Sequence, residues 1–182
     1  ISPLYNFCIE FPLTASFIKL AMGFSLERSL PTVQFTSLEK WFERYAKNHS
    51  QNGFKNGLVY LLADEFTNHN EVPLGKKTVK LLNHLGYGVA IPKGIVTGRS
   101  FISKGMLIEA KALANNNVEQ LSTLISSEHP LIGIEPSALL TFRDEIPALV
   151  DADKRNQAES LKPNCLLIDE FIAREFKAGK IS

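Results

Sequence analysis

The chain has 182 residues, of which 45% are apolar and 21% are charged, and this composition fits a globular domain with a full core and a small annex. Its 20 basic and 19 acidic residues leave a formal net charge of +1 without any basic run, which argues against nucleic-acid binding and against attachment to anionic membranes. Cys8 and Cys165 lie far apart and outside any Cys-x-x-Cys pair, so we expect core thiols in a reducing compartment rather than a disulfide scaffold.

The most apolar stretch runs from Phe7 to Phe24 and is interrupted by Glu10, Pro12 and Lys19. These interruptions argue against a membrane-spanning helix. We expect instead a helix over residues 14–22 that is buried or covered by a partner.

A second helix with an aromatic face is predicted next. Thr36 and Glu39 have the spacing of a capping box, and apolar residues then recur at helical intervals from Leu38 to Tyr45. Trp41 and Phe42 on this face are expected to pack in the core rather than to stack on a ligand.

Residues 48–57 form a polar, glycine-bearing linker, and there we divide the chain into an N-terminal helical annex, residues 1–57, and an α/β domain, residues 58–182. Apolar runs of strand length then alternate with helical patterns, as parallel strands covered on both faces require. We predict an α/β fold in which helices flank a parallel sheet of three or four strands in a Rossmann-like three-layer arrangement. The predicted strands are Leu58–Ala63, Tyr87–Pro92 and Leu131–Ile134, with Cys165–Ile168 either a fourth strand or the beginning of the last helix.

The strongest helical pattern follows the second predicted strand. Ser103 is expected to cap this helix, whose apolar residues recur every three or four residues from Leu107 to Ile125. The asparagines at 115–117 are expected to face solvent, because the apolar phase continues through them. A helix that begins at Pro136 is expected to end at Pro147. The other predicted helices are 73–85, stopped by Gly86, a short one within 151–161, and one over 167–176.

Polar turns follow the first three predicted strands, and a parallel sheet places such turns along one edge. We therefore expect them to share one crevice. Gly98 and Arg99 stand at a helix start that can hold an anion through backbone N–H groups; alternatively, Arg99 and Lys104 are solvated surface charges. The candidate crevice and anion-binding residues are Glu65, Asn68, Gly98, Arg99, Ser103, Lys104, Glu135 and Ser137.

Other site chemistries find little support in the residues. Neither the three-glycine dinucleotide fingerprint nor a Walker lysine pattern is present. Glu65, His69, Glu71 and Glu135 lack the tight spacing of metal ligands, and no metal is predicted. Ser137 lacks the Gly-x-Ser-x-Gly elbow of a serine nucleophile, so we expect no catalytic residue in this chain.

Three segments, Phe66–Gly75, Gly98–Gly105 and Gly133–Glu145, resemble in their order the cysteine-rich CCG domain. That domain forms the C-terminal region of FAD-linked, iron–sulfur dehydrogenases of the glycolate and D-lactate type. It is similar to modules in heterodisulfide reductase and anaerobic glycerol-3-phosphate dehydrogenase. The resemblance covers about residues 58–150 and implies FAD and 4Fe–4S clusters in a parent protein. The N-terminal annex looks like the linker between a ferredoxin-like domain and the CCG region.

The resemblance places the family's ligand cysteines at positions that here hold Glu65, Val96, Thr97, Glu135 and Ala138. Since iron–sulfur clusters need thiolates, it implies that this chain binds no cluster and carries no cofactor of its own. CCG domains usually come as two copies. We therefore interpret the sequence as a first, degenerate copy within a longer protein.

The leading functional hypothesis is a structural and docking domain of a FAD- and iron–sulfur-dependent 2-hydroxyacid dehydrogenase of the glycolate or D-lactate type. Its expected partners are the FAD domain, the ferredoxin-like domain and the second CCG copy of the same polypeptide, together with a second copy of the protein in a homo-oligomer formed through the N-terminal apolar surface. The alternative is a free-standing module that binds a small anion at the Gly98–Lys104 turn. The expected location is cytoplasmic, at the periphery of the inner membrane in the parent protein.

Overall fold

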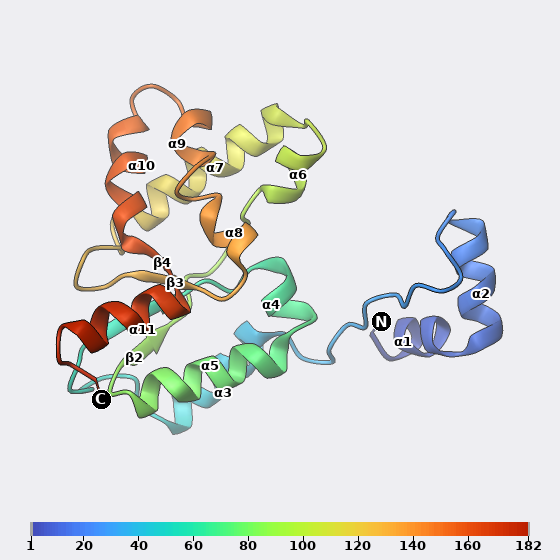
Figure 1. Cartoon of the computed structure of the whole chain (residues 1–182), viewed down its shortest axis with the longest axis horizontal. Coiled ribbons are helices and arrows are strands. Elements are labelled where there is room, and N and C mark those ends of the chain that lie inside the picture. The colour runs from blue at the N-terminus through green and yellow to red at the C-terminus, as the bar shows by residue number, and fades with distance from the viewer. Residues whose placement is uncertain (1, 182) are drawn as a thin grey trace.

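A computed structural model describes residues 2–181, and within them the strands form one parallel sheet (Figure 1). The sheet has four strands in the order β2-β1-β3-β4, which confirms the predicted α/β class and makes Cys165–Leu167 a strand. Each strand is three or four residues long. The strands are β1 Leu58–Leu61, β2 Gly88–Ala90, β3 Leu131–Gly133 and β4 Cys165–Leu167.

The strand order places a potential ligand-binding crevice at the sheet edge between β1 and β3. Val59 of β1 pairs with Val89 of β2, whereas Leu61 of β1 pairs with Ile132 of β3. The chain therefore leaves β1 toward one side of the sheet and later returns to its other side. In open parallel sheets, the loops on either side of such a reversal diverge and leave room for a ligand.

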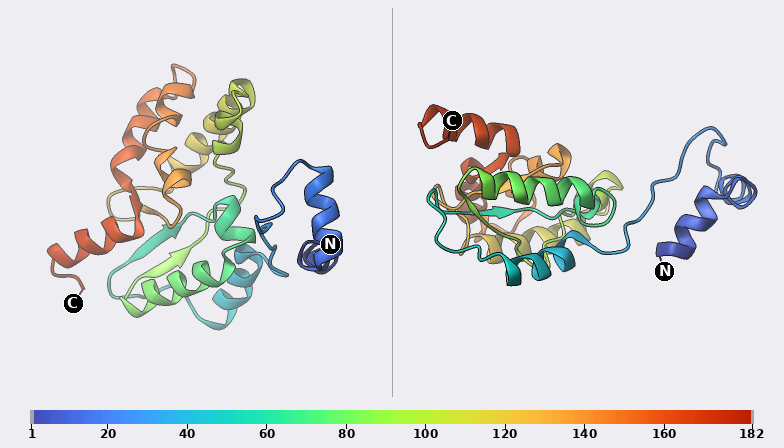
Figure 2. Two further views of the ribbon diagram at one scale, coloured as in Figure 1. Left: turned by 45° about the vertical axis from the view of Figure 1, so that its right-hand side comes forward. Right: turned by 90° about the horizontal axis from the view of Figure 1, so that it is seen from below.

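Helices cover both faces of the sheet, as the three-layer prediction requires (Figures 1 and 2). One face packs against α3 Leu38–Asn48, α5 Val72–His84 and α11 Ile168–Lys177. The other face packs against a second group that includes the longest helix, α7. That group comprises α7 Leu107–Leu121, α8 Pro136–Leu140, α9 Ile146–Leu149 and α10 Arg155–Leu161, after which the short 3-10 turn Lys162–Asn164 leads into β4.

Three local predictions were wrong because side-chain capping and proline act at other positions. Ser103 does not cap α7; it ends a separate short helix, α6 Arg99–Ser103, and α7 begins after Met106. Pro147 does not end a helix, because it lies in the first turn of α9, where its missing N–H costs no hydrogen bond. Ser37, not Thr36, caps α3 and accepts a hydrogen bond from the Lys40 backbone N–H at 3.3 Å.

Asn117 also departs from its prediction. It is fully buried on α7, and its side-chain amide donates to the Val96 carbonyl oxygen at 2.8 Å. Asn116 is exposed and Asn115 is half-buried, so the solvent-facing prediction fails at the one asparagine that faces the loop after β2. The apolar phase of the helix could not reveal this, because an amide can occupy a core position when a backbone carbonyl meets it.

The N-terminal helices α1 Ser2–Glu10 and α2 Pro12–Ala21 form a hairpin that stands away from the α/β body (Figure 2). An extended segment, residues 29–34, connects the hairpin to the body, and we call it the strap. The Asn6 side chain bonds both polar backbone groups of Val33, and the next residue, Gln34, donates its N–H to the His69 carbonyl at 2.8 Å. Within residues 2–181, no helix is long and apolar enough to cross a membrane.

Helix α3 belongs by its contacts to the α/β body, although the sequence division grouped it with the annex. Leu38 at its start is fully buried, and a Cβ on Gly75 of α5 would lie only 2.5 Å from a Leu38 methyl carbon. The absence of a side chain at Gly75 therefore lets α3 and α5 pack closely. The division at residue 57 remains a proposal about folding units.

We predict that Leu38→Ala lowers the free energy of unfolding by about 2–5 kcal/mol, because it leaves a cavity between two helices. Urea denaturation followed by circular dichroism measures this change. Ile108→Ala, at a highly exposed position of α7, is the matched control and should change stability by less than about 0.5 kcal/mol. Equal effects of the two substitutions would show that α3 does not stabilise the body.

A buried carboxylate ties the last helix to the sheet. Glu175 of α11 accepts hydrogen bonds from the Tyr87 hydroxyl at 2.5 Å, from Lys180 at 2.9 Å and from Arg174 at 2.8 Å. Burial by itself would raise the pKa of Glu175, but these three donors together hold it below its usual value. Burial, and then the Glu175 hydrogen bond, raise the pKa of Tyr87, which therefore stays neutral and donates.

This arrangement predicts a stability loss in acid. Because the folded-state pKa of Glu175 is depressed, its contribution is present above the ordinary value of 4.5 and is lost as pH falls through the folded value. We expect Glu175→Gln to lower the free energy of unfolding by about 1–3 kcal/mol at neutral pH. The difference in free energy of unfolding between the wild-type protein and Glu175→Gln should disappear at low pH, and urea denaturation across the acid range will measure it. A gap that is independent of pH would contradict the assignment.

Candidate functional site

A small crevice of about 130 Å³ opens at the carboxyl-terminal edge of the sheet, where the loops after β1, β2 and β3 meet. The crevice lies at the reversal of strand order, as the sheet topology requires. It therefore joins segments that are about 35 residues apart in sequence, the usual repeat of a strand–helix unit. Its lining comprises Asp64, Glu65, Phe66, Arg99, Ser100, Glu135 and Ala138.

Asp64 shapes the first loop. It is buried, and its carboxylate accepts from the backbone N–H groups of Phe66 and Thr67 at 2.9 and 3.1 Å, which caps the short helix α4 Glu65–His69. The Thr67 hydroxyl donates to the second carboxylate oxygen at 2.5 Å. Only residues 62–64 separate β1 from α4, and the side chain of Glu65 at the start of α4 reaches the loop after β2.

Glu65 connects the first loop to the second. Its carboxylate accepts from the Thr97 backbone N–H at 3.1 Å and from the Thr97 hydroxyl at 3.0 Å. Thr97 is itself buried, while Glu65 is exposed. Beneath Thr97, Asn117 holds the Val96 carbonyl, so the loop after β2 is fixed from both sides.

Gly98 turns the chain into α6. Its φ of +76° lies in the left-handed region, which a residue with a side chain rarely adopts. Arg99 follows and is exposed, and within residues 2–181 it takes part in no ion pair. Its side chain lines both the crevice and a neighbouring hollow of about 400 Å³. That hollow is lined by Arg99, Ile102, Ser103, Ser137, Leu140, Thr141, Asp144 and Glu145.

Glu135 shapes the third loop. It caps α8 by accepting from the backbone N–H of Ser137 at 3.3 Å, and it also accepts from the Ser137 hydroxyl. The preceding Gly133 permits α8 to lie close to β3, because a Cβ there would lie 2.6 Å from the Leu139 Cβ. Ser137 is thus committed to the cap and is not placed as a nucleophile.

The eight candidate residues divide into three groups. Glu65, Arg99 and Glu135 line the crevice, Gly98 adjoins it, and Ser103 and Ser137 line the neighbouring hollow together with Arg99. Asn68 lies elsewhere, because its side-chain oxygen accepts from the Glu39 backbone N–H at the start of α3. Lys104 is exposed at the end of α6 and lines neither the crevice nor the hollow.

The chemistry of the crevice is acidic. Asp64, Glu65 and Glu135 oppose the single cation Arg99, and the Thr97 N–H that could face an anion is already bonded to a carboxylate. Within residues 2–181, no group of three or more His, Cys, Asp or Glu side chains could hold a metal ion. The arrangement is therefore suited to tying loops together and to meeting a positively charged group.

Neither of the two cysteines lines the crevice. Cys165 lies fully buried in β4, and burial raises the pKa of its thiol to about 12, so it stays protonated. Cys8 is half-buried in the N-terminal hairpin rather than in the core that we expected. The residues at the crevice thus do not fit an iron–sulfur cluster, which requires thiolate ligands.

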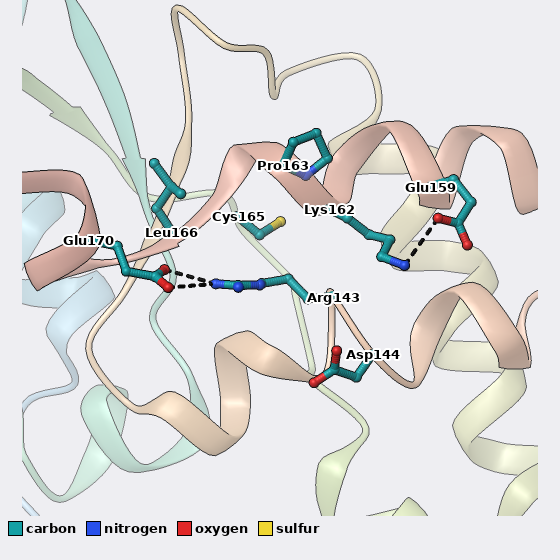
Figure 3. A pocket seen from close by; sticks show the side chains of 8 residues that line it. All are labelled: Arg143, Asp144, Glu159, Lys162, Pro163, Cys165, Leu166 and Glu170. Carbon is teal, nitrogen blue, oxygen red and sulfur yellow. Dashed lines mark hydrogen bonds and ion pairs between the residues drawn. The ribbon is translucent and has the colours of Figure 1, made fainter. Parts of the chain in front are cut away.

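A larger surface pocket, of about 530 Å³, was not anticipated from the sequence (Figure 3). It lies beside the edge strand β4, and its charges pair internally: Arg143 with Glu170 at 2.8 Å and Lys162 with Glu159 at 3.1 Å. No motif marks these residues, which come from the loop before α9 and from residues 159–170. Its lining comprises Arg143, Asp144, Glu159, Lys162, Pro163, Cys165, Leu166 and Glu170.

Comparison with known proteins places the chain near two kinds of dehydrogenase. It is 24% identical over 181 residues to one subunit of the anaerobic glycerol-3-phosphate dehydrogenase of Escherichia coli K12, and the alignment covers 98% of this chain and 44% of that protein. The D-2-hydroxyglutarate dehydrogenase of Pantoea ananatis is 24% identical over 189 residues, which is 98% of this chain and 17% of that protein. The enzyme of the same name from Pseudomonas putida is 29% identical over 99 residues, covering 53% of this chain and 10% of that protein.

The chain thus spans less than half the length of the curated relatives it matches. No family model matches it, and no solved structure does either. The similar proteins are dehydrogenases, as the resemblance implied, whereas the CCG domain itself is not matched.

We predict that Glu65→Ala lowers the free energy of unfolding by about 1 kcal/mol, because the Thr97 N–H and hydroxyl lose their acceptor. Glu65→Gln keeps a carbonyl oxygen and should lose less. Glu128→Ala, an exposed glutamate in the loop before β3, is the control and should change little. Urea denaturation measures all three, and a Glu65→Ala protein as stable as the control would contradict the role assigned to Glu65.

Proposed function

We propose that this chain is a structural and docking domain of a FAD- and iron–sulfur-dependent dehydrogenase that oxidises a small 2-hydroxy acid, and that it performs no chemistry of its own. The observation that carries the proposal is the convergence of the positions at which CCG domains hold their cysteines. Glu65 bonds to Thr97, Glu135 and Ala138 lie with Glu65 in one crevice, and Val96 adjoins Thr97. The sheet edge is thus built as a cluster-binding domain would require, but without thiolates.

The names of the relatives fit one reaction class. Glycerol 3-phosphate and 2-hydroxyglutarate each contain a carbon that bears a hydroxyl group, and a dehydrogenase removes two electrons and two protons from such a centre. No amino-acid side chain is a comparable two-electron acceptor, so a flavin or a nicotinamide must supply that chemistry, and the proposal assigns it to a flavin. In this proposal the FAD and the 4Fe–4S clusters belong to other domains of the parent protein.

A docking role fits the charge of the sheet edge. The crevice and its neighbouring hollow contain Glu65, Glu135, Asp144 and Glu145 around the single cation Arg99. An acidic surface steers and orients a basic surface of a partner domain. The rival function, an anion-binding module at the Gly98 turn, has less support, because Glu65 already occupies the Thr97 N–H and α6 has only five residues.

The proposal predicts that residues 1–182 remain colourless after anaerobic incubation with iron and sulfide, with no stoichiometric iron and no cluster absorbance. The reason is that Cys165 is buried and Cys8 lies on a separate hairpin, so the two thiols cannot ligate one cluster. The same treatment of the full-length parent should give a cluster spectrum. A brown protein solution with cluster absorbance and stoichiometric bound iron would refute the proposal.

The docking role itself is tested in the full-length protein by Asp144→Asn combined with Glu145→Gln, because these two exposed carboxylates belong to the acidic surface that would meet a basic partner. We expect substrate to reduce the flavin at an unchanged rate while electron delivery to a dye falls several-fold. Lys47→Ala on α3, at an exposed position away from the crevice, is the control and should leave both rates unchanged. A slower flavin reduction would instead place the two carboxylates in substrate chemistry, and unchanged electron delivery would contradict the docking role.

A further inference from the structure

The outer face of α2 has the pattern of a buried helix but is uncovered. Leu13, Phe17 and Leu20 follow each other at intervals of four and three residues, and Phe24 lies just beyond the end of the helix at Ala21. Their side chains are 76%, 72%, 75% and 47% exposed. The opposite face of α2 is already used, because Ala15 is buried against α1. The helix is therefore apolar on both faces, which is typical of a helix inside a bundle.

Helix α1 adds a second uncovered stripe. Leu4, Phe7 and Phe11 are exposed, and the rings of Phe7 and Phe11 stack with their centroids 5.7 Å apart. Ile9 of α1, by contrast, is buried. The pair α1–α2 thus holds together through small and aliphatic side chains while most of its large apolar side chains face outward. We call these seven outward residues the hairpin surface: Leu4, Phe7, Phe11, Leu13, Phe17, Leu20 and Phe24.

The body of the same molecule does not cover the hairpin surface. The strap beyond α2 is held at Val33 by Asn6 and at Thr32 by Asn70, whose side chain donates to the Thr32 carbonyl at 2.6 Å. These bonds fix the near end of the hairpin beside α4 and leave its outer faces in solvent, as both views in Figure 2 show.

We propose that the hairpin surface binds the hairpin surface of a second copy of this chain, so that two hairpins form a four-helix bundle. Each of the seven side chains exposes on the order of 100 Å², about half of a large apolar residue. Together they offer about 700 Å² per copy, close to the roughly 800 Å² per partner of a stable interface. Homodimer interfaces are also the most apolar class, and α-helical hairpins pair readily into bundles.

Charge supports a self-complementary partner. Between residues 3 and 26 the chain carries one acidic residue, Glu10, and one basic residue, Lys19. A two-fold axis brings a surface against its own copy, and this nearly uncharged surface meets no repulsion there. Membrane-surface helices usually carry several cations on a polar face, but here the single Lys19 ammonium donates to the Leu26 carbonyl. The dimer does not depend on the proposed dehydrogenase role.

The test is the mass of residues 1–182 in solution, measured by sedimentation across micromolar concentrations. We expect a reversible dimer that Phe17→Glu combined with Leu20→Glu weakens about a hundredfold or more, because two central apolar contacts are replaced by buried charge. Ile108→Glu, 85% exposed on α7, is the matched control and should leave the dimer intact. Circular dichroism will check that the body remains folded, which we expect because the hairpin stands apart from it.

A second measurement does not rely on any variant. Amide hydrogen exchange of residues 12–24 in the unmodified chain should slow as protein concentration rises, while exchange of the sheet strands stays constant. A monomer at all concentrations would overturn the proposal, as would a dimer that withstands both glutamate substitutions. Co-sedimentation of a monomer with phosphatidylcholine–phosphatidylglycerol vesicles would overturn it in favour of a lipid surface.

Discussion

Parallel pairing of four short strands is the constraint on which the rest of the molecule depends. A strand of three or four residues makes few hydrogen bonds, so the sheet is held mainly by apolar side chains that helices cover on both faces. The same parallel direction places every loop that leaves a carboxyl end on one edge. Asp64, Thr97 and Glu135 are neighbours for this reason, although they lie far apart in sequence.

At that edge, hydrogen bonds to carboxylates order the loops that follow the strands. Glu65 links the loop after β1 to Thr97 in the loop after β2, while Asp64 and Glu135 each cap the helix that follows their own strand. Each carboxylate meets backbone N–H groups at a helix start or a tight turn, where such groups lack partners. The edge is therefore ordered by hydrogen bonds within the chain itself.

Two distinct surfaces follow from this architecture. The sheet edge is polar and acidic, and it belongs to the α/β body, whereas the hairpin surface is apolar and stands on a strap outside the body. An acidic edge gives orientation and speed of association, and an apolar helical face gives affinity. Two of the relatives align over 98% of the chain, so their alignments include most or all of the segment that forms the hairpin here.

The sequence alone determined the α/β class, the approximate place of each strand, and the meeting of Glu65, Arg99 and Glu135, because runs of apolar residues and the parallel rule need only local information. Tertiary structure decided the rest. Asn117 lies in the core, where its side-chain amide donates to the Val96 carbonyl. Asn68 lies outside the crevice, because its side-chain oxygen accepts from the backbone N–H of Glu39 at the start of α3. Helix α3 joined the body through Leu38 against Gly75. Each of these three contacts joins residues about 20 to 37 positions apart, and no local sequence pattern contains both partners.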